Sequence, residues 1–125
     1  MEIEVSIGEI VDKLSILDIK IKNIKDVDKL KNIEKEFNYL NDIVFNQLKI
    51  DEIDYHRLVD INTKLWIIED DIREKERSSE FDEDFVKLAR AVYFTNDDRS
   101  VIKKDINLKY GSDFIEEKSY SDYKK

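Results

Sequence analysis

Hydrophobic residues near the start of the chain recur at alternating steps of three and four positions, which places them on one face of an α-helix. The stripe consists of Ile7, Ile10, Leu14, Leu17, Ile21 and Ile24. A stripe sustained over about three heptads is typical of a helix that packs along its length against another helix. We therefore expect a first helix that begins beside Ser6 and ends near Lys25.

The same periodicity recurs three times further along the chain. Its apolar positions fall within residues 30–48, 58–72 and 85–106. Each of these segments is long enough for a separate amphipathic helix. The last helix has one weak point, because the polar stretch from Thr95 to Asp98 is able to break it into two.

Residues that favour helix ends separate these segments. Ser6, Asp26 and Asp51 each precede a helix, where a side-chain oxygen can accept a hydrogen bond from the helix backbone. Gly111 follows the fourth helix, and glycine adopts the left-handed backbone of a helix C-terminus at little cost. The residues after Gly111 show no helical period, so they predict an extended tail.

The composition supports an all-α fold. The 125 residues include no proline and only two glycines, so the frequent tight turns of a compact sheet would be hard to supply. We expect an antiparallel bundle of about four helices, arranged as two helical hairpins. Residues 1–110 would form this bundle, and residues 111–125 would form a C-terminal tail that packs on it.

Charge and cysteine content narrow the partners and the compartment. The formal net charge is −8, so a phosphate backbone would be repelled and no nucleic acid is expected. The absence of cysteine fits a reducing compartment. The first ten residues carry no long apolar run, so neither a signal peptide nor a membrane span is expected. Together these features predict a cytoplasmic protein.

Five polar residues occupy positions on the inward faces of the expected helices: Asp18, Glu69, Arg73, Asn96 and Arg99. A buried charge without a partner costs several kcal/mol, so the two acids and two arginines would have to pair inside the bundle. One interpretation is a network that fixes how the helices align. Another is a pocket whose arginines bind a carboxylate or phosphate ligand. A simple pair along the helix surface would also account for Glu69 and Arg73.

No motif predicts a catalytic residue, a metal site or a cofactor. Glu9 with Asp12, and Glu69 with Asp70, superficially resemble the carboxylate Mg²⁺ sites of helical nucleotide pyrophosphatases. Mg²⁺ needs converging oxygen ligands, whereas Asp12 and Asp70 are expected to point away from the apolar stripes. His56 is the only histidine, and we expect it on an outer helix face.

A second apolar stripe, formed by Tyr55, Val59 and Trp66, lies beside the main stripe of the third helix. Such a stripe is more than one helix contact requires. It predicts a homodimer that forms through these helix faces.

Four segments resemble successive blocks of an uncharacterised bacterial family, a domain of unknown function: "VSIGEIVDKLSILDIK", "LWIIEDDIREKE", "FVKLARAVYFTNDDRSVIKKDIN" and "GSDFIEEKSY". Members of that family often lie near, or are fused to, sugar-transfer and surface-polysaccharide proteins. Because the charged tail falls in a block, the resemblance implies that the tail folds back, with Glu116 or Glu117 meeting Arg73 or Arg99.

Two functions are compatible with these features. The helical stripes and the lack of a nucleophile favour a non-enzymatic accessory or interaction module, linked through the resemblance to polysaccharide and glycosyl-transfer systems. A protein partner would then be expected. The alternative is a small enzyme or ligand-binding protein whose five inward polar residues bind an anionic metabolite or a nucleotide with Mg²⁺.

Overall fold

The computed structural model describes residues 1–119 and 121, and within them it contains four α-helices and no strand. The helices are α1 (Ile7–Asn23), α2 (Val27–Asp42), α3 (Glu52–Arg77) and α4 (Glu83–Lys109), with a π-helical turn, η1 (Ile43–Gln47), after α2. The expected all-α fold is confirmed. The fourth helix is continuous, because residues 95–98 remain helical.

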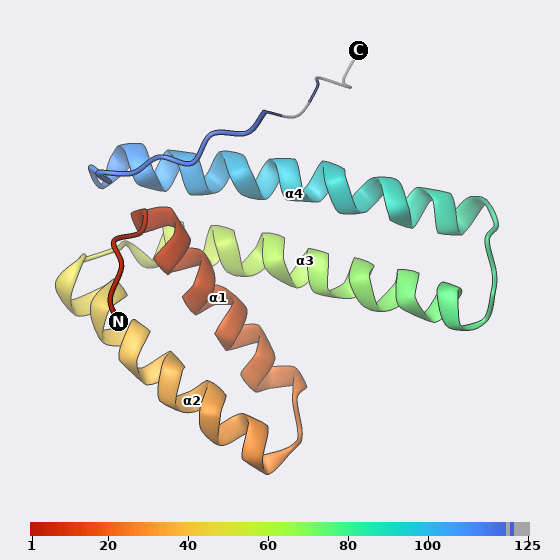
Figure 1. Ribbon diagram of the computed structural model, residues 1–125, viewed down its shortest axis with the longest axis horizontal. Helices are drawn as coiled ribbons and strands as arrows, with labels where there is room; N and C mark the ends of the chain where they lie inside the picture. Colours follow the sequence, from red (N-terminus) through yellow and green to blue (C-terminus); the bar gives the residue numbers. More distant parts are fainter. Residues whose placement is uncertain (120, 122–125) are drawn as a thin grey trace.

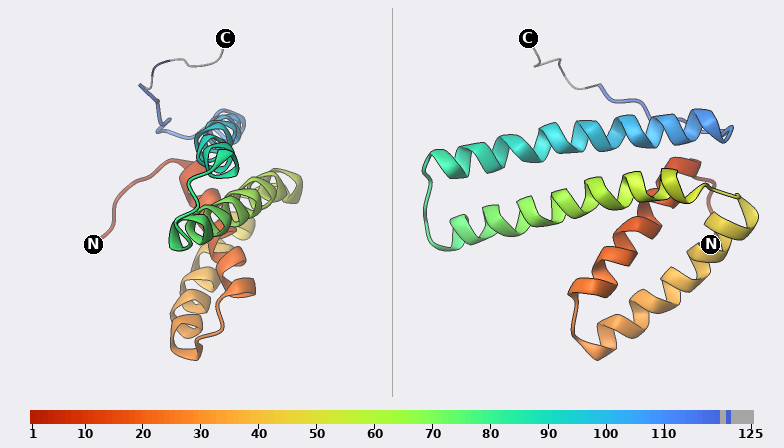
Figure 2. Two further views of the ribbon diagram at one scale, coloured as in Figure 1. Left: turned by 90° about the vertical axis from the view of Figure 1, so that its right-hand side faces the viewer. Right: turned by 180° about the vertical axis from the view of Figure 1, so that it is seen from behind.

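The four helices form the two expected hairpins, and the hairpins cross at an angle. In Figure 1, α3 and α4 run antiparallel, and α1 crosses them near the start of α3 and the end of α4. The α1–α2 hairpin therefore leans away from the α3–α4 hairpin, as the second view in Figure 2 shows. The far half of the α3–α4 hairpin extends past α1 and has no third helix against it.

The helix boundaries follow the expected capping residues. Ser6 Oγ accepts from the backbone N of Glu9 at 3.2 Å, and Asp26 Oδ1 accepts from Lys29 N at 3.0 Å. Asp51 caps α3 in the same way, by accepting from the backbone N of Ile53. These short-range predictions are confirmed because a cap needs only a few neighbouring residues.

The end of α4 has the expected left-handed glycine. Gly111 has a φ of 69°, and the backbone N of Ser112 donates to Asn107 O at 2.8 Å. This hydrogen bond satisfies a carbonyl in the last turn and directs the chain back along α4. The tail then runs beside α4 toward its middle (Figure 1).

The second helix ends earlier than its stripe predicted. After Asp42 the chain widens into η1, and Lys49 then adopts a left-handed φ of 57°. This turn buries Val44 and brings Ile50 into the core, where the backbone N of Ile50 donates to Val44 O at 3.0 Å. The chain thus leaves the regular α-helix at the point where Val44 and Ile50 pack into the core.

The core lies where the hairpins cross. Its buried residues are Val11, Leu14, Val44, Ile50, Tyr55, Leu58 and Ile106. Helix α1 is at the centre, because it contacts α2, α3 and α4, whereas α2 contacts only α1 and η1. No residue of α2 is buried.

The first turn of α1 lies close against α4. Gly8 N donates to Asn107 Oδ1 at 2.6 Å, and a Cβ on Gly8 would stand 2.6 Å from the carbonyl oxygen of Lys103. Only a residue without a side chain fits so near another backbone. This contact sets how closely the two hairpins approach at their crossing.

The far half of the α3–α4 hairpin, residues 69–94, contains no buried residue. We call this segment the outer hairpin.

No helix in the described part of the chain is long and apolar enough to cross a membrane.

Candidate functional site

Asp12 on α1 is the most deeply buried charged residue at the hairpin crossing, with 1% of its surface exposed. Arg99 on α4 binds it with two nitrogens. Nε donates to Oδ1 at 2.9 Å, and Nη2 donates to Oδ2. This contact raises the pKa of Arg99 above its usual value. A bidentate pair of this kind is directional, so it fixes α4 relative to α1.

Asn62 on α3 and Ser15 on α1 complete the polar contacts around Asp12. Asn62 Nδ2 donates to Asp12 Oδ1 and to Ser15 Oγ, both at 2.8 Å. Ser15 Oγ donates to the backbone oxygen of Asp12 at 2.6 Å. We call Asp12, Ser15, Asn62 and Arg99 the Asp12 cluster. It joins three helices, and no buried side-chain nitrogen or oxygen in the described residues lacks a hydrogen-bond partner.

The expectation that Asp12 points away from the helix contacts is wrong. Helix α1 is covered by α2 on one side and by α3 and α4 on another, so it has two buried faces. The stripe from Ile7 to Ile24 marked only one of them. The small residues Gly8 and Ser15 flank Asp12 on the second face. Their spacing in the sequence is the feature that could have indicated this second buried face.

The structure separates Asp18 from the other predicted site residues. Asp18 Oδ2 accepts a hydrogen bond from Tyr55 Oη at 2.9 Å, and Oδ1 lies 3.7 Å from Lys22 Nζ. Burial, together with this contact to Asp18, raises the pKa of Tyr55 above its usual value. Asp18 thus belongs to the contact between α1 and the start of α3.

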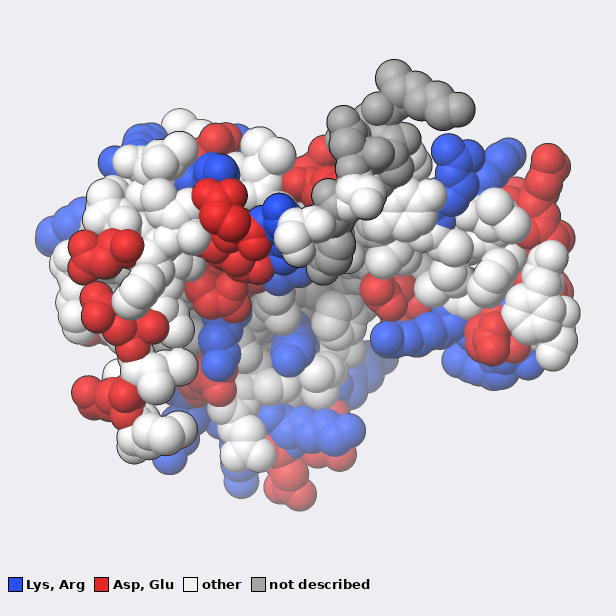
Figure 3. Space-filling view, turned by 45° about the horizontal axis from the view of Figure 1, so that its top comes forward, with Lys and Arg blue, Asp and Glu red and all other residues white. Residues whose placement is uncertain are grey.

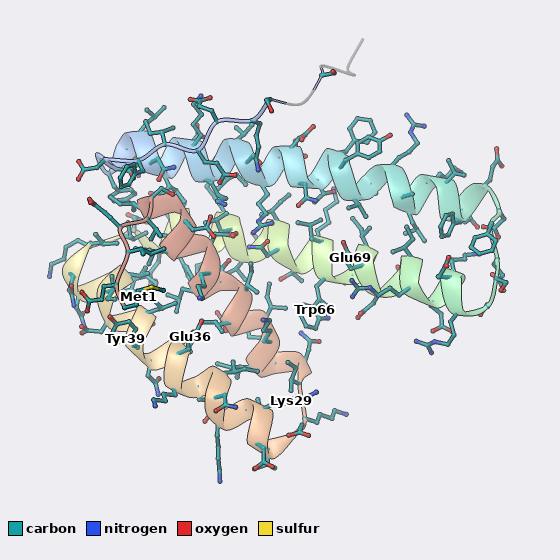
Figure 4. All side chains as sticks on the ribbon, viewed as in Figure 1. Met1, Lys29, Glu36, Tyr39, Trp66 and Glu69 are labelled. Atoms are coloured by element: carbon teal, nitrogen blue, oxygen red, sulfur yellow. The ribbon has the colours of Figure 1, made fainter. Side chains whose placement is uncertain are left out.

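The remaining four predicted residues, Glu69, Arg73, Asn96 and Arg99, line one hollow of about 410 Å³. Its other lining residues are Ile16, Ile19, Asn62, Leu65, Trp66 and Asp70. We call this hollow the notch. It lies in the angle between α1 and the part of α3 that continues past it, where Figure 4 labels Trp66 and Glu69.

The notch has an apolar floor and a charged rim. Ile19 and Leu65 are buried, and Ile16 and Trp66 are partly exposed. On the rim, Arg73 Nη2 lies 3.3 Å from Glu69 Oε2. The predicted pairing of these two residues along one helix is therefore present in the structure.

A second hollow, of about 560 Å³, adjoins the other side of Arg99. It is lined by Tyr93, Asn96, Asp97, Arg99, Ser100, Lys103 and Lys118. Lys103 Nζ lies 2.7 Å from Glu9 and 3.4 Å from Glu116. Acidic and basic side chains are interspersed on the face shown in Figure 3. The cations beside both hollows thus already have acidic neighbours.

The tail contacts differ from the expected ones. Glu116 pairs with Lys103 and Lys118, and Glu117 Oε1 lies 3.2 Å from Lys104 Nζ. Among the described residues, the tail glutamates pair with lysines and form no ion pair with Arg73 or Arg99, although the charge of Glu116 contributes to the raised pKa of Arg99. Tyr120 and residues 122–125 lie outside the described residues.

The dimer face expected from the second apolar stripe is wrong for Tyr55. Tyr55 is 6% exposed and stands edge-on to Phe45, with 5.2 Å between the ring centres. Val59 packs against the same core, so both residues are used within the chain. Of this stripe, only Trp66 lines an open surface feature.

No three His, Asp or Glu side chains within residues 1–119 and 121 converge as a metal site requires. His56 is exposed and lies beside Tyr55, with 5.6 Å between the ring centres.

The chain is therefore a small all-α protein, in which two crossed helical hairpins are joined by the buried Asp12 cluster and leave the notch open between them. The chain matches the family of unknown function DUF6165 over residues 1–123, and it belongs to that family. The resemblance to an uncharacterised family is therefore confirmed. Neither the curated proteins nor the solved structures offer a match.

Proposed function

We propose that the protein is a non-enzymatic interaction module that works as a homodimer. One observation carries this proposal: the outer hairpin has no buried residue. Two helices alone cover only one side of each other's apolar surface, and an isolated hairpin rarely buries enough to be stable. A second molecule against the outer hairpin would supply the missing cover.

Exposed apolar side chains on and beside the outer hairpin support this proposal. Phe81 is 60% exposed, Val86 is 52% exposed and Ile67 is 55% exposed. Covering such groups is favourable by about 25 cal/mol for each Å² of apolar surface removed from water. Phe81 and Val86 lie close together in sequence at the loop end of the outer hairpin, where one partner surface would cover both.

The Asp12 cluster supports a structural role rather than catalysis. The carboxylate of Asp12 is held by Arg99 and Asn62, and it is almost completely shielded from solvent. A general acid or base must reach the proton that it transfers. Asp12 has no such access, so the cluster serves to join the hairpins.

Light scattering during size-exclusion chromatography tests the proposal. We expect a particle of twice the 15.0 kDa chain mass, with dissociation on dilution over about a hundredfold concentration range. A chain that stays monomeric at the highest concentration would refute the homodimer.

The resemblance in the four sequence blocks supports an accessory role in polysaccharide and glycosyl-transfer systems. The direct test is calorimetric titration of the protein with a sugar-transfer protein of the kind that lies near members of the resembled family. We expect saturable binding with a fixed stoichiometry. Absence of heat and of co-elution would remove this assignment and leave the dimer unaffected.

A second candidate function is a ligand site in the notch, because four of the five predicted residues line that hollow. The candidate ligands are an anionic metabolite or a nucleotide with Mg²⁺. An anion would compete with Glu69 for Arg73, and breaking this exposed pair would cost less than about 1 kcal/mol.

A thermal-shift screen with nucleotides, nucleotide sugars and sugar phosphates, each with and without Mg²⁺, tests this candidate. We expect Arg73→Ala to abolish any shift. The matched control is Arg77→Ala, which removes an exposed arginine paired with Glu74 on the same helix, outside the notch. No shift with any of these compounds would eliminate the ligand site.

A further inference from the structure

We propose that the end of the α3–α4 hairpin from one copy seats in the notch of a second copy, beside Trp66. We call this end, residues 77–86, the tip. The proposal rests on the homodimer proposed above and names the two surfaces that form it.

The tip presents aromatic surface to solvent on an ordered support. Phe81 is 60% exposed and stands edge-on to Phe85, with 5.2 Å between ring centres. Lys75 Nζ holds the loop by pairing with Glu80 at 3.0 Å and Asp82 at 2.9 Å. An apolar ring held in place before binding loses little conformational entropy when it docks.

The notch offers surface of the matching kind. Its floor of Ile16, Ile19 and Leu65 lies next to the partly exposed ring of Trp66. A volume of about 410 Å³ accommodates a phenyl ring. Binding hot spots combine an aromatic anchor, an apolar pocket and a polar rim in this way.

Charge selects the tip as the occupant of the notch. About one turn beyond the notch residues Ile16 and Ile19, α1 carries Lys20 and Lys22; Lys25, Lys29 and Lys31 follow in the loop and the start of α2, with Asp26 and Asp28. The tip has the opposite balance: Glu80 and Asp82 are paired with Lys75, and Glu83 and Asp84 add two exposed carboxylates at the start of α4, against Arg77. The two segments attract each other, although the chain as a whole is acidic.

Two-fold symmetry allows both contacts to form together. In an isologous dimer, the tip of each copy enters the notch of the other. The helix from Trp66 to Arg77 spans eleven steps, or about 16 Å at 1.5 Å per residue. The outer hairpins would overlap over about this length, which gives each the neighbour that its own chain does not supply.

Trp66 is the only tryptophan, so its fluorescence reports on the notch directly. We expect the emission of the wild-type protein to shift to longer wavelength on dilution, in step with the fall in mass seen by light scattering. Phe81→Ala should weaken the dimer by about thirtyfold or more and give red-shifted emission at concentrations where the wild type is dimeric. Leu108→Ala trims an exposed apolar residue at the other end of α4, far from the tip; it is the matched control and should leave the dimer intact.

A charge exchange tests the pairing of surfaces. Glu83→Lys with Asp84→Lys should weaken the dimer, and adding Lys22→Glu with Lys25→Glu to the same chain should restore it. A monomeric wild type would overturn both the homodimer and this inference. Two results would overturn this inference and leave the homodimer standing. One is a Phe81→Ala variant with the mass and the Trp66 emission of the wild-type dimer. The other is a Glu83→Lys, Asp84→Lys variant whose dimer is not restored by Lys22→Glu with Lys25→Glu.

Discussion

Arg99 near the middle of α4 and Asp12 in the second turn of α1 form a two-point ion pair where the hairpins cross. Asp12 is sealed from solvent, whereas the Arg99 side chain is 25% exposed. The pair therefore connects the interior of the crossing to the wall of the notch. Its removal should affect stability first, because a buried carboxylate depends on its partner.

Arg99→Ala should destabilise the fold by about 3–5 kcal/mol, because it leaves the Asp12 carboxylate buried with only Asn62 as a side-chain donor. Urea unfolding at neutral pH measures the loss. Arg73→Ala is the control, since that side chain is 73% exposed in its pair with Glu69 and should cost less than about 1 kcal/mol. Equal losses for the two variants would contradict the structural role given to the Asp12 cluster.

Gly8→Ala should also destabilise the fold, by about 1–3 kcal/mol, because its new methyl group would meet the backbone oxygen of Lys103 at 2.6 Å. Backbone atoms cannot turn aside, so α1 and α4 would have to separate. Thermal unfolding checks the result. Gly111→Ala is the comparison, because nothing lies within 4 Å of its Cβ position and only its left-handed φ of 69° opposes the change. A neutral Gly8→Ala would show that the crossing tolerates wider spacing.

Asp54 should contribute to the pH dependence of folding. Burial acts to raise its pKa, but hydrogen bonds from Lys109 Nζ at 2.7 Å and Tyr110 Oη at 2.6 Å prevail and hold the pKa below the usual 3.8. The folded state therefore binds this proton less readily than the unfolded state. The resulting stability is present above pH 3.8 and is lost as the pH falls through the lower folded pKa.

Asp54→Asn should consequently cost about 2 kcal/mol at neutral pH, and its deficit relative to the wild type should shrink in acid. Urea unfolding measured across the acid range gives the comparison. Asp60→Asn, a change at an exposed position of the same helix, controls for the general loss of one negative charge. A deficit for Asp54→Asn that stays constant with pH would refute the assignment.

Local features of the fold could be predicted from sequence, and features that depend on the crossing of hairpins could not. Ser6, Asp26 and Asp51 cap their helices because each acts on residues directly after it. Asp12 was misplaced because its burial depends on α3 and α4, which cover a second face of α1. One apolar stripe does not reveal that a helix is covered on two sides.

The candidate site was likewise predictable where it depends on a single helix and not where it depends on the hairpin crossing. Helical geometry alone correctly indicated that Glu69 and Arg73 share a face, and they pair at 3.3 Å. It also grouped them with Asn96 and Arg99 beside one hollow. It could not place Asp18, since the angle between the hairpins turns that part of α1 toward Tyr55.

The absence of buried residues in α2 has a consequence for how the native state opens. Helix α2 rests only on α1 and η1, so it can detach while α1, α3 and α4 keep the Asp12 cluster intact. Amide hydrogen exchange should therefore be fastest, among the helices at the crossing, in α2, and slowest in the first half of α1. The chain would thus consist of a durable three-helix unit and a second helix that unfolds at lower free energy.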